Sequence, residues 1–264
     1  MRKLLISTVI LFGFFIMFLI LKNNHSNIPE IDVSNPNLIE IPFSKNEIVN
    51  RINNKNKKIN SILIKNMPIK AKNGRMTFKL TGDLAHSKDK FFRFIVTSKI
   101  TGKEMDIGSN NDIFWFWSKR ISPPALYFSK HEDLWKTNLK TPLNPAWMIE
   151  SLNINLIDQN NISSISEDGV YLYLREKRKT AAGDDCVFIT VIHKKSETVW
   201  ARKLIDLNGN GIVSTFYSGE NIIIDWKDEN ASMEWDTTNK ELNVNLSNSM
   251  WQLPKYKNKI NMGE

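Results

Sequence analysis

Cysteine is almost missing from this chain of 264 residues, in which Cys186 is the single example. One thiol excludes an internal disulfide, so a packed core has to hold the fold together. It also excludes a lipid-modified N-terminus, because that modification needs a cysteine directly after the first apolar segment, where this chain has Lys22. Cys186 begins the apolar run Cys186–Ile189 and is therefore predicted to be buried, without a redox role.

Motifs for metal binding or catalysis are absent as well. The four histidines, His25, His86, His131 and His193, do not have the spacing of metal-binding pairs. Asp184 lies in a glycine-containing loop without a G-x-S-x-G motif nearby. We therefore expect no cofactor and no enzymatic activity. The alternative is a hydrolase whose residues, for example Asp184 and His193, meet only in the folded protein.

The segment Asp206–Gly211 has the D-x-N-x-N-G pattern of the first half of a calcium loop. The second half does not follow, because the position that should carry a bidentate glutamate is Tyr217. An Asn-Gly pair between two apolar runs is also the usual signal for a tight hairpin. We therefore expect a hairpin turn here and no metal site.

Positive charge is in excess, with a net charge of +8 and an isoelectric point near 9.4. The basic residues are scattered among asparagines, and the sequence has no arginine-rich helix or nucleic-acid-binding motif. Nucleic acid is therefore not expected as a partner. A generally lysine-rich surface explains the charge, and attraction to anionic lipid head groups is the alternative.

The chain does have a nearly continuous apolar run from Leu4 to Leu21, preceded by Arg2 and Lys3. As a helix this run would rise about 27 Å, close to the ~30 Å thickness of a hydrocarbon core. Residues 1–22 are therefore predicted to be a membrane anchor or a signal segment. No A-x-A-like cleavage site follows, which favours a retained anchor, with cleavage as the alternative. The positive-inside rule places the rest of the chain outside the cytoplasm.

Residues 23–43 contain three prolines among asparagines and are predicted to be a linker, followed by one domain over 44–264. The domain opens with the capping-box sequence Ser44-Lys45-Asn46-Glu47, which predicts a helix to about residue 59. Asn144-Pro145 similarly predicts a short helix that continues to Leu152.

From Ile62 onward apolar residues recur with a period of two, the period of a strand with one buried face. The pattern predicts strands over 62–70, 75–84, 91–98, 104–107, 113–119, 125–128, 169–175, 187–193, 198–206, 212–217, 222–226, 232–236 and 241–246. A mainly β (α+β) fold with a large, curved antiparallel sheet follows. Helices too few to fill its concave face would leave an apolar groove.

Three stretches resemble a known family. They are the charged loop and aromatic strand Lys88–Phe94, the segment Met105–Trp117 with Pro123–Phe128 after it, and the segment Asn144–Leu152. Their order resembles the LolA/LolB-like outer-membrane lipoprotein-sorting superfamily, in particular its uncharacterised lipoprotein-like members, over about residues 44–254. The resemblance implies an unclosed antiparallel β half-barrel of about 11–12 strands, with short helices covering a concave face that accommodates acyl chains.

Six residues are expected to line the lipid-binding cavity. Phe92, Phe94 and Val96 share one face of their strand, opposite Arg93, and are expected to point inward. Two tryptophans share a face of the next aromatic strand, and a third lies on the short helix that would cover the groove: Trp115, Trp117 and Trp147. For each residue, ordinary core packing is the alternative.

The resemblance also assigns a basic residue of the cargo loop. By its spacing from the aromatic strand this residue is Lys88, with Lys90 beside it. The proline that normally follows is replaced here by Asp89.

Together these patterns predict a protein of the bacterial cell envelope, anchored in the inner membrane with its domain in the periplasm, or free in the periplasm if the segment is cleaved. It would hold acyl chains of a lipid or lipoprotein during envelope trafficking. The alternative is a non-enzymatic module on the same fold that fills the groove with its own side chains and binds envelope proteins. An open groove distinguishes the two.

Overall fold

A computed structural model describes residues 45–88, 90–136, 145–180 and 183–263. The predicted anchor over 1–22, the predicted linker over 23–43 and the two helix caps at Ser44 and Asn144 lie outside the described residues. In the part of the chain that the structure describes, no helix is both long and apolar enough to cross a membrane.

Strands make up most of the described chain. In chain order they are β1 (Ser61–Asn73), β2 (Met76–Ser87), β3 (Phe92–Ser98), β4 (Gly102–Ser109), β5 (Ile113–Ser118), β6 (Leu126–Lys130), β7 (Ile162–Glu167), β8 (Tyr171–Lys179), β9 (Asp185–His193), β10 (Thr198–Asp206), β11 (Gly211–Ser218), β12 (Asn221–Trp226), β13 (Ala231–Asp236), β14 (Glu241–Leu242) and β15 (Lys259–Asn261). The period of two locates most of them, because strand residues alternate between a packed face and a more open one, as in β3.

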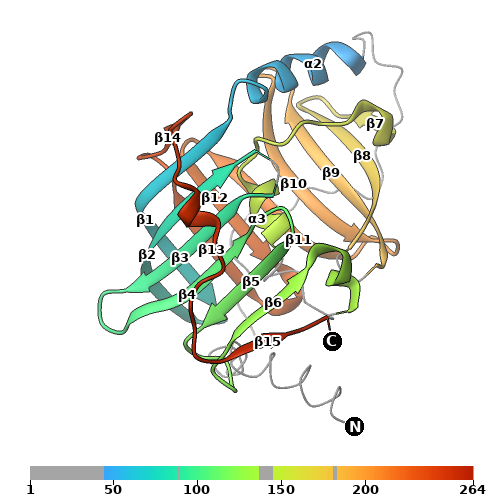
Figure 1. Ribbon diagram of the computed structural model, residues 1–264. Helices are drawn as coiled ribbons and strands as arrows, with labels where there is room; N and C mark the ends of the chain where they lie inside the picture. The colour runs from blue at the N-terminus through green and yellow to red at the C-terminus, as the bar shows by residue number, and fades with distance from the viewer. Residues whose placement is uncertain (1–44, 89, 137–144, 181–182, 264) are drawn as a thin grey trace.

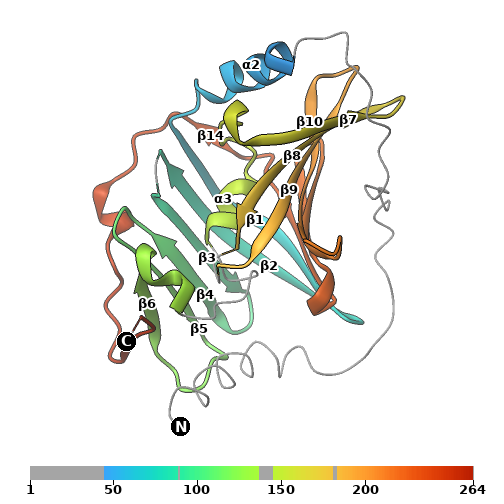
Figure 2. The same cartoon turned by 90° about the vertical axis from the view of Figure 1, so that its right-hand side faces the viewer.

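All 15 strands belong to one sheet (Figure 1). Their order is β15-β6-β5-β4-β3-β2-β1-β13-β12-β11-β10-β9-β8-β7, with β14 paired to β1 outside this path. Neighbours run antiparallel except β15, which is parallel to β6. The order ends in β15 on one side and β7 on the other, so the sheet is not closed. Figure 2 shows that it bends until β1 to β6 face β7 to β12. The predicted unclosed half-barrel is confirmed.

The strand prediction is wrong in its details. Fifteen strands exceed the expected number of about 11–12. The sequence pattern misses β7, where serines take the places of apolar residues, and β15, which has only three residues. It also predicts too long a strand over 241–246. β14 ends at Leu242 because Asn243 adopts a left-handed φ of 57°, which takes the chain out of the ladder.

The described chain has two α-helices (Figure 2): α3 (Pro145–Ser151) lies between the two halves of the sheet, and α2 (Lys45–Asn56) lies over one end of it. Both helices are predicted by the sequence, although α2 ends three residues earlier than expected. α2 packs Ile48, Val49 and Ile52 against β7 to β10. Short 3-10 helices within the described chain are η1 (His131–Lys136), η3 (Gln159–Asn161), η4 (Lys227–Glu229) and η5 (Asn248–Trp251).

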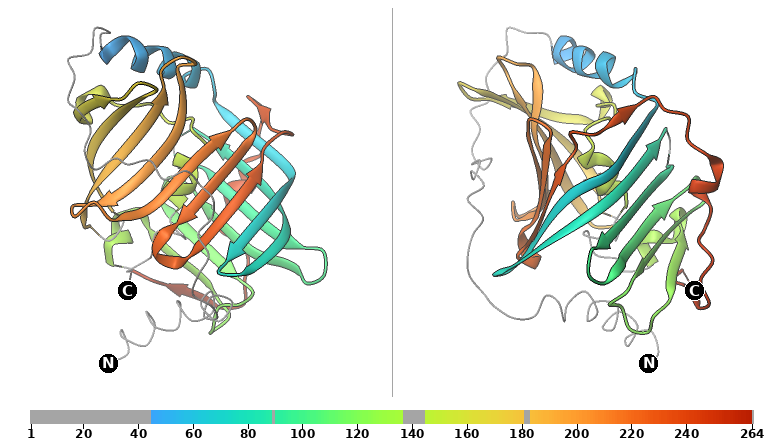
Figure 3. Two further views of the ribbon diagram at one scale, coloured as in Figure 1. Left: turned by 180° about the vertical axis from the view of Figure 1, so that it is seen from behind. Right: turned by 90° about the vertical axis from the view of Figure 1, so that its left-hand side faces the viewer.

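The chain after β14 forms a strap, residues 243–258, on the outer face of the sheet (Figures 1 and 3). Because β14 pairs with β1 and β15 pairs with β6, the strap has to cross the strands between them. Outward-facing side chains hold it: Ser61 Oγ donates to the Val244 carbonyl at 2.7 Å, and Arg93 donates to the Met250 carbonyl at 3.3 Å. The strap therefore covers the face opposite to the main core.

Candidate functional site

The concave face of the sheet is apolar, and α3 packs into it (Figure 2). Trp147 of the helix belongs to the same core as Phe94 of β3 and Phe188 of β9, which come from the two facing halves. The Trp147 ring meets Phe188 edge-on with 6.0 Å between centroids, and Phe94 lies 5.3 Å from the ring of Trp235. All four rings are buried. α3 therefore fills the space between the two halves.

A cluster of four charged side chains holds the other side of α3. Glu150 of the helix accepts hydrogen bonds from Arg178 at 2.9 Å and from Arg202. Arg178 also pairs with Glu176 at 2.9 Å, and its guanidinium lies 3.8 Å from the centre of the Phe188 ring. Arg202 is only 2% exposed. Two carboxylates and two guanidinium groups balance in charge, which is the condition under which charges tolerate burial.

The carboxyl groups of this charge cluster have shifted pKa values. Burial alone would raise the pKa of Glu150, but Arg202 and Arg178 outweigh it and hold the pKa below its ordinary value. For Glu176 burial prevails and raises the pKa, with Arg178 opposing. Glu150 is therefore the ionised group that ties α3 to the arginines of β8 and β10.

Four of the six expected cavity residues come together on the concave face. Phe92, Phe94, Val96 and Trp147 all belong to the main core and are buried. The inward orientation expected for the first three agrees with this placement. Their role in lipid binding remains a prediction, because the same positions suit core packing.

The structure does not bring the other two tryptophans to this face. Strand register aligns Arg93 with Gly108 and Gly108 with Trp115, so the tryptophan shares the outer face with the arginine. The Arg93 guanidinium lies 5.5 Å from the centre of the Trp115 ring, and Trp117 stacks on Tyr256 of the strap at 5.4 Å. Trp115 and Trp117 thus lie between the sheet and the strap, away from the concave face. Phe114 and Phe116 occupy the inward positions instead.

The expected cargo-loop lysines lie at the surface. Lys88 and Lys90 flank the turn between β2 and β3 and are both exposed, while Asp89 lies outside the described residues. The Lys88 backbone amide donates to the Asn60 carbonyl at 3.0 Å, which fixes one side of the turn. Neither side chain lies in the concave face, so their proposed contact with cargo would take place at the surface.

The remaining sequence expectations have simple outcomes. Cys186 is buried in the main core, as predicted. The Asp206–Gly211 segment is the predicted hairpin turn between β10 and β11, with Asp206 Oδ1 accepting from the backbone amides of Asn208 and Asn210. Asp184 directly precedes β9 and His193 ends it, about 30 Å apart at the rise of an extended strand, so they do not share a site.

His86 is a buried polar residue of the concave face. It lies on β2, opposite Ile62 of β1 and Phe92 of β3, and is 5% exposed. Burial lowers its pKa to about 4, and a backbone hydrogen bond at Phe91 opposes this shift only in part. The imidazole is therefore neutral at physiological pH.

This histidine should make folding sensitive to acid. The folded state releases the His86 proton more readily than the unfolded state. The contribution of His86 to stability is therefore fully present above pH 6.5 and is lost progressively as the pH falls toward 4. We expect His86 to account for about 2 kcal/mol of lost stability between pH 7.5 and pH 5. Denaturant unfolding of the wild type and His86→Gln at both pH values measures it, since the carboxylates contribute equally to both proteins. An unchanged pH dependence in the variant would contradict the assignment.

Sequence reasoning misses the charge cluster. Its only local signal is Glu150, an acidic residue inside the otherwise apolar stretch of α3. Its partners Arg178 and Arg202 are 28 and 52 residues away and lie on separate strands, so only the fold brings them together. A charge on the buried face of a short helix is the observation that could have suggested a buried partner.

Comparison with known proteins identifies solved structures with a similar fold. No family model matches the sequence, and no curated protein matches it either. A DUF1329 family protein from Desulfovibrio piger is 12% identical with a TM-score of 0.50, and the match covers 78% of this chain and 95% of that chain. A LolA superfamily protein from Nitrosomonas europaea is 8% identical with a TM-score of 0.52, covering 80% and 98%. At these identities the likeness concerns the fold alone, and on that level the resemblance is confirmed: this chain has the fold of a LolA superfamily protein.

Proposed function

We propose that this protein binds acyl chains of a lipid or lipoprotein on its concave face, without catalysing a reaction, and that α3 moves aside to admit them. The observation that carries the proposal is the way the apolar face is covered. Phe92, Phe94 and Val96 share one buried core with α3, a helix of only seven residues. A helix this short has little stability of its own, so its position depends on its contacts.

The energies make such an exchange feasible. Burying an acyl chain contributes about 0.8 kcal/mol per methylene, so ten methylenes supply ~8 kcal/mol. Displacing α3 costs the burial of Trp147 and Met148 and the ion pairs of Glu150. An acyl chain lying on the same rings recovers the apolar part of that cost, and solvation of Glu150 recovers some of the polar part.

The alternative function, a module that binds envelope proteins, has one observation in its favour. The concave face is filled by the protein's own side chains, with Trp147 buried between the two halves. On this reading α3 is a permanent part of the core, and the outer surface carries the function. A lipid-binding experiment therefore decides between the two.

For location, we propose that residues 1–22 anchor or export the chain and that residues 23–43 link them to one domain in the periplasm of a bacterial envelope. The sequence pattern of the apolar run supports this proposal. A LolA superfamily protein among the structural matches is consistent with it.

The turn between β3 and β4 has the composition of a membrane contact. Ile100 is 94% exposed at its tip. Lys99 and Lys103 flank it, and the neighbouring turn after β5 adds Lys119 and Arg120, all with exposed side chains. Lys119 donates to the Thr101 carbonyl at 2.6 Å, which joins the two turns. An exposed apolar residue surrounded by cations suits insertion between anionic lipid head groups.

We expect Ile100→Ser to weaken binding to vesicles containing anionic phospholipid by about tenfold or more, because the apolar side chain contributes up to ~2–3 kcal/mol when it enters the membrane. Co-sedimentation of residues 23–264 with the vesicles measures the change. The matched control is Val170→Ser, an exposed apolar residue in the turn before β8, at the opposite end of the strands. Equal losses in both variants would contradict a specific contact at Ile100.

Mass spectrometry tests the lipid proposal. We expect residues 23–264, purified without detergent from a membrane-containing host, to carry acyl lipid at near one molecule per chain that is lost after organic extraction. Val96→Phe should reduce the bound lipid, because the larger ring occupies the concave face. Trp117→Ala, on the outer face, should leave it unchanged. A lipid-free mass after incubation with vesicles would exclude the lipid function and favour the protein-binding alternative.

A further inference from the structure

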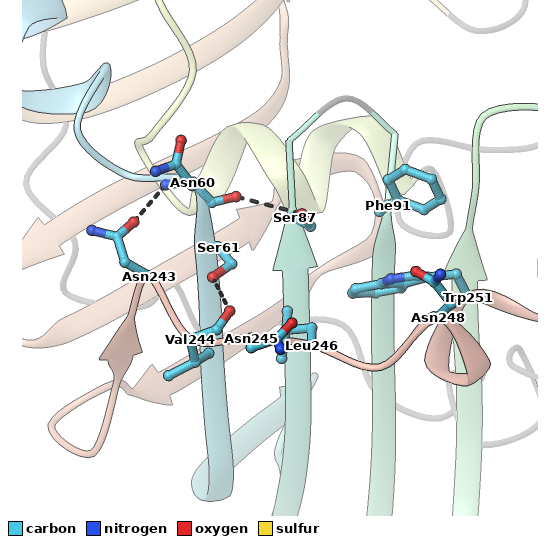
Figure 4. A pocket seen from close by; sticks show the side chains of 10 residues that line it. All are labelled: Asn60, Ser61, Ser87, Phe91, Asn243, Val244, Asn245, Leu246, Asn248 and Trp251. Carbon is cyan, nitrogen blue, oxygen red and sulfur yellow. Dashed lines mark hydrogen bonds between the residues drawn. The ribbon is translucent and has the colours of Figure 1, made fainter.

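A cavity lies on the outer face of the sheet, opposite the concave face. It has a volume of about 340 Å3 and opens between the start of β1, the end of β2 and the strap (Figure 4). Its lining consists of four asparagines, two serines, two aromatic residues, a valine and a leucine, so none of the ten lining residues carries a formal charge. The concave core lies on the other side of the strands.

Several polar groups of the lining are available to a ligand. Asn243 is occupied, since its side chain accepts from the Asn60 amide at 2.7 Å and donates to the Lys58 carbonyl at 3.0 Å. The side-chain amides of Asn60, Asn245 and Asn248 make no hydrogen bond to any residue that the structure describes. Each such amide offers two donors and an acceptor. The cavity therefore presents both kinds of hydrogen-bonding group side by side.

Two aromatic rings form the other wall. Phe91 and Trp251 lie 5.6 Å apart between ring centroids, inclined at 43° (Figure 4). Trp251 belongs to η5 of the strap, and its carbonyl accepts from the Asn110 side chain at 3.1 Å. Arg93 fixes the strap on either side by donating to the carbonyls of Met250 and Gln252. The wall is thus held in place before any ligand arrives, which lowers the cost of binding.

We propose that this cavity binds a neutral saccharide. Sugar hydroxyl groups both donate and accept hydrogen bonds, as the free asparagine amides do, and the C–H face of a sugar ring packs on aromatic rings. The other classes of ligand fit less well. A divalent cation needs carboxylate oxygens and a phosphate needs arginine or lysine, and the lining has neither. The volume is at the lower end of the range for small-molecule sites.

Titration calorimetry of the full-length chain with maltotriose and with chitotriose tests the proposal. We expect at least one of the two to bind, and the double variant Asn245→Ala/Asn248→Ala to bind it about tenfold more weakly, because two hydrogen bonds are lost. Both side chains are exposed, so the fold should be unaffected. Asn54→Ala, an exposed asparagine of α2, is the matched control and should bind like the wild type.

A second variant, Phe91→Leu, should also weaken binding, because it removes one aromatic ring but keeps an apolar side chain. The same titrations with vesicles that carry the bound sugar as a glycolipid head group distinguish a soluble saccharide from a membrane glycolipid, and a loss in the asparagine double variant with either form supports the site. Absence of binding to both trisaccharides at millimolar concentration, or equal binding by the wild type and the double variant, would overturn the proposal.

Discussion

Replacing Glu150 with alanine is expected to lower the free energy of unfolding by about 3–5 kcal/mol, the usual cost of removing one partner from a buried ion pair. The variant leaves Arg202, which is 2% exposed, without its carboxylate partner in a site that water hardly reaches. Arg178 retains its ion pair with Glu176, so the loss of Glu150 leaves this arginine with a partner. Chemical denaturation of the wild type and the variant measures the difference.

Two further variants make this prediction specific. Glu132→Ala removes a carboxylate that pairs with Lys130 at 3.5 Å on the surface, and it should change stability by no more than ~0.5 kcal/mol. The double variant Glu150→Ala/Arg202→Met should recover part of the loss, since it removes the uncompensated charge as well. A similar, small effect of Glu150→Ala and Glu132→Ala would show that the charge cluster does not hold α3.

The Glu150→Ala variant also separates the two proposed functions. If α3 moves to admit an acyl chain, weakening its ion pairs makes that movement easier, and the variant should take up more lipid from vesicles than the wild type. If α3 is a permanent part of the core, the variant is merely less stable and takes up none. The comparison requires a temperature at which both proteins remain folded.

Asp106→Ala is expected to have an effect of similar size on the outer face, also about 3–5 kcal/mol. Asp106 is completely buried and binds Arg93 through both oxygens, at 2.7 and 2.8 Å. Arg93 in turn donates to two carbonyls of the strap. Without its carboxylate the arginine should shift toward water and release the strap. Hydrogen exchange should therefore accelerate around η5 more than in β1 to β6.

Lys103→Ala is the matched control for this prediction. Lys103 pairs with the same carboxylate at 3.1 Å, but its side chain is 41% exposed. Its removal leaves the contact between Arg93 and Asp106 intact and should cost less than ~1 kcal/mol, with no change in exchange around η5. Strap protection that is the same in Asp106→Ala and the wild type would show that packing of Trp251 and Tyr256 alone holds the strap.

Local sequence signals account for most of the elements of this fold and for part of the site. The capping sequence and apolar spacing predict α2, and the Asn-Pro step predicts α3, because helix starts depend on residues within one turn. Alternation within β3 correctly predicts that Phe92, Phe94 and Val96 lie on the face opposite Arg93, because successive strand residues point to opposite sides. The apolar run Cys186–Ile189 correctly predicts a buried thiol.

These local signals could not predict contacts between segments that are far apart in the chain. Alternation within β5 puts Trp115 and Trp117 on one face, but which face that is depends on the register with β4 and β3, where a slip of one residue exchanges the two sides. Glu150 finds Arg178 and Arg202 only when two strands far along the chain are paired. The sequence alone thus determined which residues alternate and where helices begin, since these depend on neighbours in the chain. The tertiary structure alone decided which aromatic rings face α3, which charges balance one another and where the strap crosses the sheet, because these depend on pairing between strands.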